Sequence, residues 1–273
     1  MIVCTSCRRS MPADARFCPY CGAARPVELR YNIHPEGEHA DQEIAALFFP
    51  ALKDRLRDLL GVSVDNQPFL ERVYSSGFRD MVQRRAAQTA QSIKHQPRSN
   101  DQLNHLIENL LEDLLDFFLV RHCADLLPFP LPEDILSWQM AAPARDDMQE
   151  MILDYLDLAS EELPTHTDML KMPVEQLRNA AKYFLFADRD ERIFLIGDLS
   201  VLGSGSEGFA LTENALYWKA PLHTARRIMY PELESIRMEP DWMLVNGHFF
   251  NAGKTLNVKL FLLLKKLGRM RKM

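Results

Sequence analysis

The chain has 273 residues, a length that suits two domains better than one. Apolar residues make up 47 % of it and charged residues 26 %, near the average for globular proteins, which excludes a disordered, collagen-like or membrane-embedded chain. No apolar run approaches the roughly 18 to 20 residues that a spanning helix needs, and the N-terminus lacks the charged-then-apolar pattern of a secretory signal. We therefore expect a cytoplasmic protein, in which its five cysteines favour metal ligation over disulfides.

The N-terminus carries two C-x-x-C turns separated by ten residues, Cys4-Thr5-Ser6-Cys7 and Cys18-Pro19-Tyr20-Cys21. Each turn presents two thiolates to one metal, so the pair supplies a closed tetrahedral shell without a position for water or substrate. A redox role for C-x-x-C needs a surrounding βαβ pattern, which thirty residues cannot hold. The spacing predicts one structural zinc ion held by Cys4, Cys7, Cys18 and Cys21.

Residues 1–26, with the segment F-C-P-Y-C-G, resemble the short bacterial zinc-ribbon family and match all four of its ligands. A module this small has no apolar core, so zinc should supply most of its folding free energy. The fifth cysteine, Cys123, lies in a leucine-rich stretch and is expected to be a small buried hydrophobe.

Charge is segregated along the chain, although the net charge is only −6. Residues 101–170 hold sixteen acidic side chains against Arg121 and Arg145, and the last fifteen residues hold no acid at all. We expect the acids of the middle, such as Glu112, Asp113 and Asp116, to form a solvated helix face, with docking of a basic partner as the alternative. Candidate contacts for an anion or a partner are the basic residues near the two ends: Arg8, Arg9, Arg16, Lys265, Lys266, Arg269, Arg271 and Lys272.

The distribution of glycine separates a helical middle region from a β-rich C-terminal region, because glycine weakens helices and is needed in turns. None occurs between Phe78 and Ile196, whereas seven of the eleven lie from Gly197 to Gly268. Helices are predicted at about 41–60, 68–95, 100–118, 145–160 and 174–186, where apolar residues recur at helical spacing.

Seven short strands are predicted after residue 190, because β-branched and aromatic runs alternate there with turn signals such as Asn246-Gly247. Residues 255–267 follow as a helix with one apolar face of leucines. Strands closed by one terminal helix suggest a small barrel whose open end the helix caps, with the basic residues beyond Leu264 near solvent.

Two glycine-rich segments imitate nucleotide-binding motifs. Gly203–Gly208 matches G-x-G-x-x-G, but the residues after it read as two strands about a turn and not as the helix that would receive a pyrophosphate. Asn251–Thr255 imitates the end of a P-loop with the wrong spacing, so Lys254 is interpreted as a turn lysine. The eight histidines are dispersed, no nucleophile elbow occurs, and a non-enzyme is expected.

The runs Gly208-Phe209-Ala210-Leu211-Thr212, Ala215-Leu216-Tyr217-Trp218 and Ile228–Ile236 resemble bacterial PH-like and GRAM-like domains over about residues 188–268. Leu216 and Leu233 replace the isoleucines commoner in that family. The resemblance implies a barrel that serves as a binding scaffold without catalysis. Its first strand loop, Ser204–Glu207, lacks the basic cluster that phosphoinositide binding needs, which favours protein contact.

The sequence thus predicts a multidomain α+β chain: zinc ribbon 1–26, linker 27–40, acidic all-α domain 41–187, PH-like β domain with its helix 188–268, and basic tail 269–273. We expect a non-catalytic adaptor that binds protein. A nucleic-acid-binding protein that uses the ribbon arginines and the basic tail is the first alternative, and a peripheral membrane protein is the second.

Overall fold

A computed structural model describes residues 1–4, 6–12, 15, 17–23, 27–139, 144 and 147–270. Two compact units are present, and neither is continuous in sequence. The first comprises Met1–Leu47 and Gln83–Glu108, and the second comprises Phe48–Val82 and Asn109–Met273. Residues 48–82 and 109–187 of the helical region therefore belong to the same unit as the strands after residue 190.

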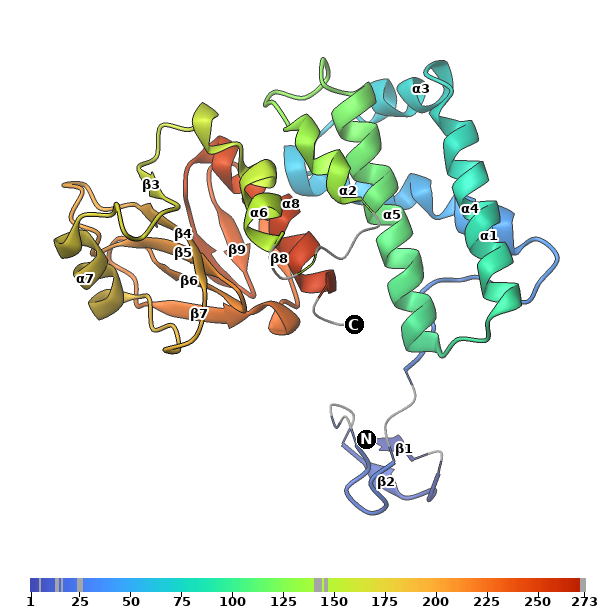
Figure 1. Ribbon diagram of the computed structural model, residues 1–273. Helices are drawn as coiled ribbons and strands as arrows, with labels where there is room; N and C mark the ends of the chain where they lie inside the picture. The colour runs from blue at the N-terminus through green and yellow to red at the C-terminus, as the bar shows by residue number, and fades with distance from the viewer. Residues whose placement is uncertain are drawn as a thin grey trace. The chain divides into compact units, whose positions relative to one another are not determined.

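The elements follow one another in the predicted order, with small strands at the N-terminus, helices in the middle and strands before a final helix (Figure 1). The exception is a two-residue strand at 165–166, inside the region predicted to be all-α, which pairs with the sheet that follows. The α-helices are α1 (Ala40–Ala46), α2 (Phe48–Leu60), α3 (Gln67–Ser75), α4 (Phe78–His95), α5 (Asn100–His122), α6 (Met148–Leu156), α7 (Val174–Tyr183) and α8 (Lys254–Met270). Short 3-10 helices are η1 (Glu133–Trp138), η2 (Leu158–Ser160) and η3 (Tyr230–Glu232). The strands are β1 (Ile2–Val3), β2 (Ser10–Met11), β3 (Thr165–His166), β4 (Ile193–Asp198), β5 (Gly208–Thr212), β6 (Ala215–Lys219), β7 (Arg226–Met229), β8 (Ile236–Met238), β9 (Met243–Val245) and β10 (His248–Phe250).

In the first unit, the segment after the ribbon is fixed to α5 by one side chain. Asn104 of α5 is buried, accepts a hydrogen bond from the backbone N–H of Arg30 at 2.7 Å and donates one to the carbonyl of Glu28 at 2.8 Å. The amide thereby satisfies two backbone groups of an irregular segment, as buried polar groups require. His34 and His39 are exposed.

The helices of the second unit pack around three phenylalanines. Phe48, Phe78 and Phe118 are buried, with ring centroids 5.0 to 6.0 Å apart in tilted or edge-to-face arrangements. Cys123 is completely buried, and burial raises the pKa of its thiol to about 12. The prediction that Cys123 is a buried hydrophobe is confirmed.

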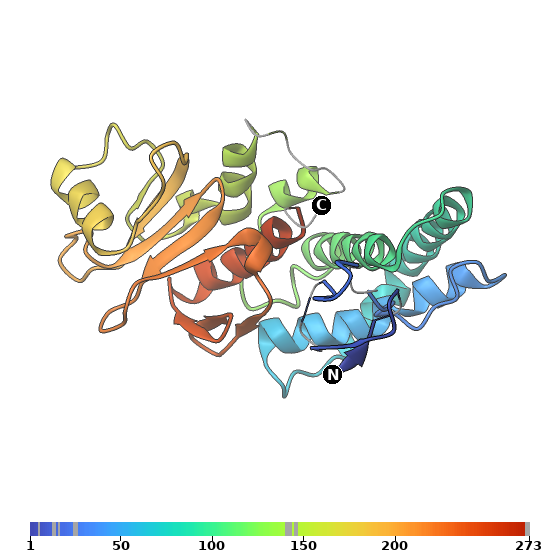
Figure 2. The ribbon, with the colours of Figure 1, turned by 90° about the horizontal axis from the view of Figure 1, so that it is seen from below.

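The strands of the second unit form two antiparallel sheets, with the orders β3-β4-β5-β6-β7 and β10-β9-β8. Phe184 and Ala180 of the α7 region pack with Ile196, Ala210 and Tyr217 of the five-stranded sheet. The alternate residues Phe209 and Trp218 contact Phe250 of β10 instead, because successive side chains point to opposite faces. Covered faces on both sides explain why β5 is buried throughout (Figure 2).

The expected closed barrel is not seen among the described strands, which form two separate sheets. Trp218 links the sheets by donating its indole N–H to the carbonyl of Phe249 at 2.8 Å. The chain is α+β, with helices and antiparallel sheets.

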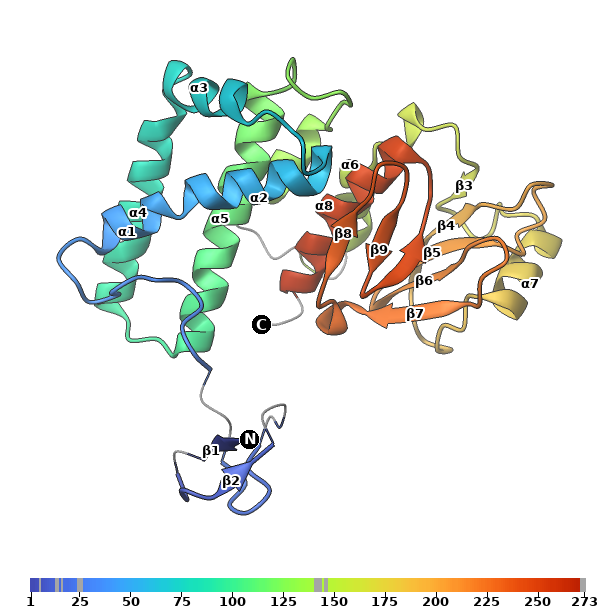
Figure 3. The same cartoon turned by 180° about the vertical axis from the view of Figure 1, so that it is seen from behind.

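Helix α8 is buried on nearly every side, and not along one face only. It packs against α6, β8 and η3 (Figure 3). The leucines of the predicted face are buried: Leu256, Leu260, Leu263, Leu264 and Leu267. The polar side chains Asn257, Lys259, Lys266 and Arg269 are buried as well.

Two cations of α8, the half-buried Lys265 and the buried Arg269, are paired with an acid of α5. Glu112 of α5 accepts bonds from Arg269 at 2.8 Å, from Lys265 at 2.9 Å and from Arg55 of α2. Arg55 also binds Asp116 at 2.8 Å. We call these five residues, Arg55, Glu112, Asp116, Lys265 and Arg269, the charge cluster.

Two expectations about charge are therefore wrong. Glu112, Asp113 and Asp116 are buried and do not form a solvated face, because the cations of α2 and α8 lie against them. Lys266 and Arg269 are 6 % and 5 % exposed and do not lie in solvent. The Lys266 ammonium donates to the carbonyl of Trp138 at 2.6 Å, and burial lowers its pKa.

Candidate metal centre

The two C-x-x-C turns fold into matching knuckles. In the first, Arg8 N–H bonds to Cys4 C=O at 2.8 Å and Cys4 N–H to Arg9 C=O at 2.9 Å. In the second, Gly22 N–H bonds to Cys18 C=O at 2.9 Å and Cys18 N–H to Ala23 C=O at 2.8 Å. The fourth residue after the first cysteine has positive φ in both, +60° at Arg8 and +72° at Gly22.

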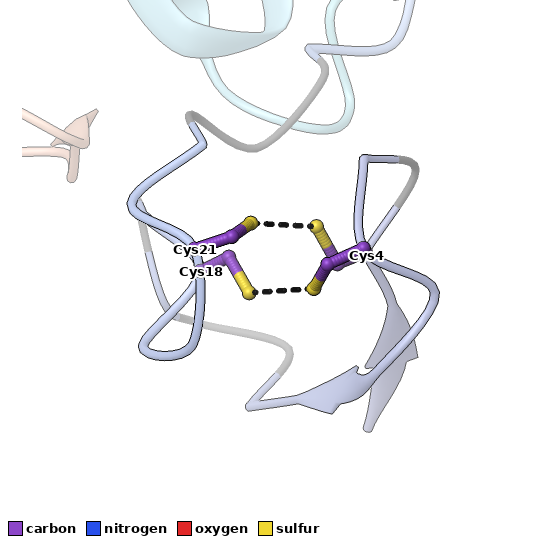
Figure 4. A group of neighbouring side chains, drawn as sticks. Cys4, Cys18 and Cys21 are labelled. Atoms are coloured by element: carbon purple, nitrogen blue, oxygen red, sulfur yellow. Dashed lines mark hydrogen bonds between the residues drawn. The ribbon is translucent and has the colours of Figure 1, made fainter.

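The predicted ligands Cys4, Cys7, Cys18 and Cys21 converge, and their Sγ atoms all lie within 4.8 Å of one another. Figure 4 shows the side chains of Cys18 and Cys21 pointing toward the first knuckle, which carries Cys4. The Sγ atoms of Cys4 and Cys21 are 3.8 Å apart, and those of Cys7 and Cys18 are 3.6 Å apart. Zinc with Zn–S bonds of about 2.3 Å in a tetrahedron separates its sulfurs by about 3.8 Å, so the donors fit one structural zinc ion.

The knuckle backbone stabilises the thiolates that a metal needs. Backbone N–H groups, first that of Cys7 and then that of Ser6, lower the pKa of the Cys4 thiol to about 6. The backbone N–H of Tyr20 similarly lowers the pKa of Cys18. At Cys7 the N–H of Arg9 acts in the same direction, but burial and the neighbouring thiols outweigh it and raise the pKa to about 11. Zinc would hold all four as thiolates.

Aromatic residues at the second knuckle escaped the sequence analysis. Phe17 and Tyr20 are 63 % and 58 % exposed, and the guanidinium of Arg9 lies over the Tyr20 ring, 5.2 Å from its centroid. Their place in so small a module was a usable signal, because the buried cluster of the ribbon's described residues consists of Cys4, Met11 and Cys18 and leaves both rings exposed. Arg8 and Arg9 are exposed as well, whereas Arg16 lies outside the described residues.

The basic residues proposed near the C-terminus do not form one exposed surface. Lys266 and Arg269 are buried, and Lys265 is paired with Glu112. Arg271 and Lys272 lie outside the described residues.

The Gly203–Gly208 loop leads into strand β5 and not into a helix, as predicted. Two backbone N–H groups of the loop already have partners: Ser204 N–H bonds to the Ser200 hydroxyl at 2.7 Å and Gly205 N–H to Asp198 at 3.0 Å. Gly205 has φ of +69°, which explains a glycine there without a nucleotide.

Among the described residues, the four ribbon cysteines are the one group of His, Cys, Asp and Glu donors close enough to hold a metal ion. In the part of the chain that the structure describes, no helix combines the length and apolar character needed to cross a membrane.

Residues 3–24 match the zinc-ribbon domain family. No curated protein and no solved structure matches the chain. The family match and the four converging cysteines together fit one structural zinc ion at the N-terminus.

Proposed function

We propose that the chain is a non-catalytic cytoplasmic adaptor whose zinc ribbon and β region bind partner proteins. The observation that carries the proposal is the exposed Tyr20–Arg9 pair, together with the exposed Phe17 of the same knuckle. Tyrosine and arginine dominate the binding energy of protein interfaces, and a metal with four thiolate ligands has no position left for catalysis.

The β region is proposed to be PH-like. Four antiparallel strands β4–β7, three antiparallel strands β8–β10 and a following helix support this, together with the resemblance of residues 188–268. The loops β4–β5 and β6–β7 leave the five-stranded sheet at the same end, since these strands are antiparallel neighbours. Val201, Leu202 and Leu222 on these loops are 91 % or more exposed, which supports a binding role for that end.

Nucleic-acid binding is the second candidate, because aromatic rings and arginines also stack on bases. Its support is weaker, because Lys266 and Arg269 are buried against acids and carbonyls of the chain itself and cannot contact phosphate. A membrane anchor at α8 has less support still, since the leucines it would insert are already buried.

Affinity capture from the host with the full chain tests the proposal, with and without nuclease. The informative variant is Tyr20→Ala. Tyr74→Ala is its matched control, because Tyr74 is 57 % exposed and has the Arg79 guanidinium 5.6 Å from its ring centroid. We expect protein partners that survive nuclease, are lost with Tyr20→Ala and are kept with Tyr74→Ala. Capture that disappears with nuclease would establish the nucleic-acid function instead.

A further inference from the structure

The second unit contains a cleft of about 730 Å³ that has no part in the metal centre. The end of α2, Pro128 and Phe129, strand β8 with the turn after it, and the start of α8 line it. Ligand sites of folded proteins have volumes of about 300 to 1,000 Å³, so the cleft has the size of a site.

The floor of the cleft is apolar and its rim carries cations. Leu59, Phe129 and Val258 are buried and line it. Arg237 and Lys254 are exposed on the rim, and neither has an ion-pair partner among the described residues. Among the described residues, the exposed Asp54 is the one ion-pair partner of Arg57, at 3.0 Å, and a pair of this kind three residues apart contributes little.

Two acids, Asp58 and Glu239, also line the cleft. Burial raises the pKa of Asp58, so its negative charge is held less firmly than that of an ordinary carboxylate. The first turn of α8 contains Lys254 and no acid, and the positive end of the helix dipole therefore adds to the cationic rim. The cleft as a whole favours an anionic occupant.

Strand β8 offers this occupant unpaired backbone. It is the edge strand of its sheet, and Ser235 C=O and Glu239 N–H bond toward the β9 side, to Asn246 and Trp242. Because these groups alternate along a strand, the N–H and C=O of Met238 point away from β9. Met238 lines the cleft, and no described residue bonds to its backbone. An extended chain can pair with such an edge, whereas a compact small molecule cannot use it in this way.

We propose that this cleft binds an extended acidic segment of a partner protein, with an apolar side chain on the Phe129–Val258 floor and carboxylates at Arg237 and Lys254. The inference rests on the proposed adaptor function and names a second contact for it. Peptide backbone would pair with Met238 at the edge of β8.

The test is to pan a library of random eight-residue peptides, displayed on phage, against the full zinc-loaded chain. We expect enrichment of peptides that carry Asp or Glu next to a Leu, Ile or Phe. Fluorescence polarisation of the enriched peptides should then show binding at least about tenfold weaker with Arg237→Glu/Lys254→Glu, since two attractions become repulsions. Both side chains are exposed and have no ion-pair partner in the described part of the chain, so the variant should keep the wild-type melting temperature.

The matched control is Lys53→Glu/Arg226→Glu, which changes the net charge equally at two exposed cations outside the cleft. A second variant, Met238→Pro, removes the outward N–H without removing a bond to β9 and should also weaken binding. No enrichment, enrichment of basic or neutral peptides, or equal binding to the cleft and control variants would each overturn the proposal. If the panning fails but affinity capture succeeds and depends on Tyr20, the proposed role of the cleft is wrong and the proposed adaptor function is still supported.

Discussion

At the scale of single residues, the four ribbon cysteines have one task and Cys123 has another. Their Sγ atoms lie within 4.8 Å of one another, whereas Cys123 is buried in the second unit. Replacement of Cys18 by Ser removes one of four thiolates and should abolish stoichiometric zinc, as measured by elemental analysis of the purified protein. Cys123→Ala is the control and should keep one zinc per chain. A Cys18→Ser protein with full zinc would refute the four-ligand site.

Arg8 and Gly22 occupy equivalent left-handed positions, but only glycine adopts this conformation without strain. A Cβ at Gly22 would meet no atom within 4 Å, so the cost of Gly22→Ala is conformational alone. We expect Gly22→Ala to weaken zinc binding by about 1 kcal/mol, or about fivefold, and Arg8→Gly to strengthen it by a similar amount. Competition with a chromophoric chelator measures the zinc affinity of both variants. Affinities that change in the same direction for the two variants would contradict this account.

At the scale of elements, the charge cluster joins α2, α5 and α8 through one carboxylate. Glu112→Gln keeps the shape of the side chain but removes the one anion that pairs with the buried Arg269 among the described residues. A buried cation left unpaired costs about 3 to 5 kcal/mol, so urea denaturation should show a loss of that order. Glu108→Gln, one turn earlier on α5 and only half-buried, is the control and should change stability by less than about 0.5 kcal/mol.

The contribution of Glu112 to stability should depend on pH. Burial alone would raise the pKa of the Glu112 carboxyl, but the cations Arg55, Lys265 and Arg269 outweigh burial and hold this pKa below the usual value of 4.5. A depressed folded-state pKa stabilises the fold above the unfolded pKa, and this contribution is lost as the pH falls through the folded value. The stability difference between wild type and Glu112→Gln should therefore be constant near neutral pH and shrink below about pH 4.5. A difference that grows on acidification would show the opposite linkage.

At the scale of the whole molecule, the strands and their terminal helix depend on residues far away in sequence. Lys259 is buried, and its ammonium lies 2.7 Å from both the Ser160 hydroxyl and the Glu161 carboxylate. Arg269 pairs with Glu112 at 2.8 Å. A fragment of residues 188–273 lacks all these partners and should be largely unfolded by circular dichroism and by proteolysis. A fragment of residues 133–273 restores those of Lys259 and should be more protected. A stable, cooperatively melting 188–273 fragment would show that α8 does not need them.

The ribbon should behave oppositely, because its metal supplies its folding free energy. Chelation is expected to unfold the ribbon while the helical circular dichroism and the main melting transition remain. The hydrogen bonds of Asn104 to the backbone of Glu28 and Arg30 involve no cysteine and should persist after chelation. Global loss of the helix signal on chelation would contradict this independence.

Local signals predicted most of the elements and the metal site. The dipeptide Asn246-Gly247 lies between β9 and β10, the leucines of α8 are buried, and the C-x-x-C spacing identified four converging thiolates. Strand β3 has only two residues, too few to show the alternation of apolar and polar residues that predicts a strand. The pairing of Glu112 with Arg269 spans 157 positions, and no local pattern distinguishes a lysine or arginine that is buried beside an acid from one that is solvated.

The position of α8 along the chain has a consequence for biosynthesis. This helix is translated after every other described element, so Arg55, Glu112 and Asp116 emerge from the ribosome well before Lys265 and Arg269. Until α8 emerges, Glu112 lacks its partners Lys265 and Arg269, and strand β8 lacks the helix that packs against it. Long-range closure of this kind makes folding slow and leaves apolar strands open to aggregation, so the nascent second unit would be a natural client for a chaperone.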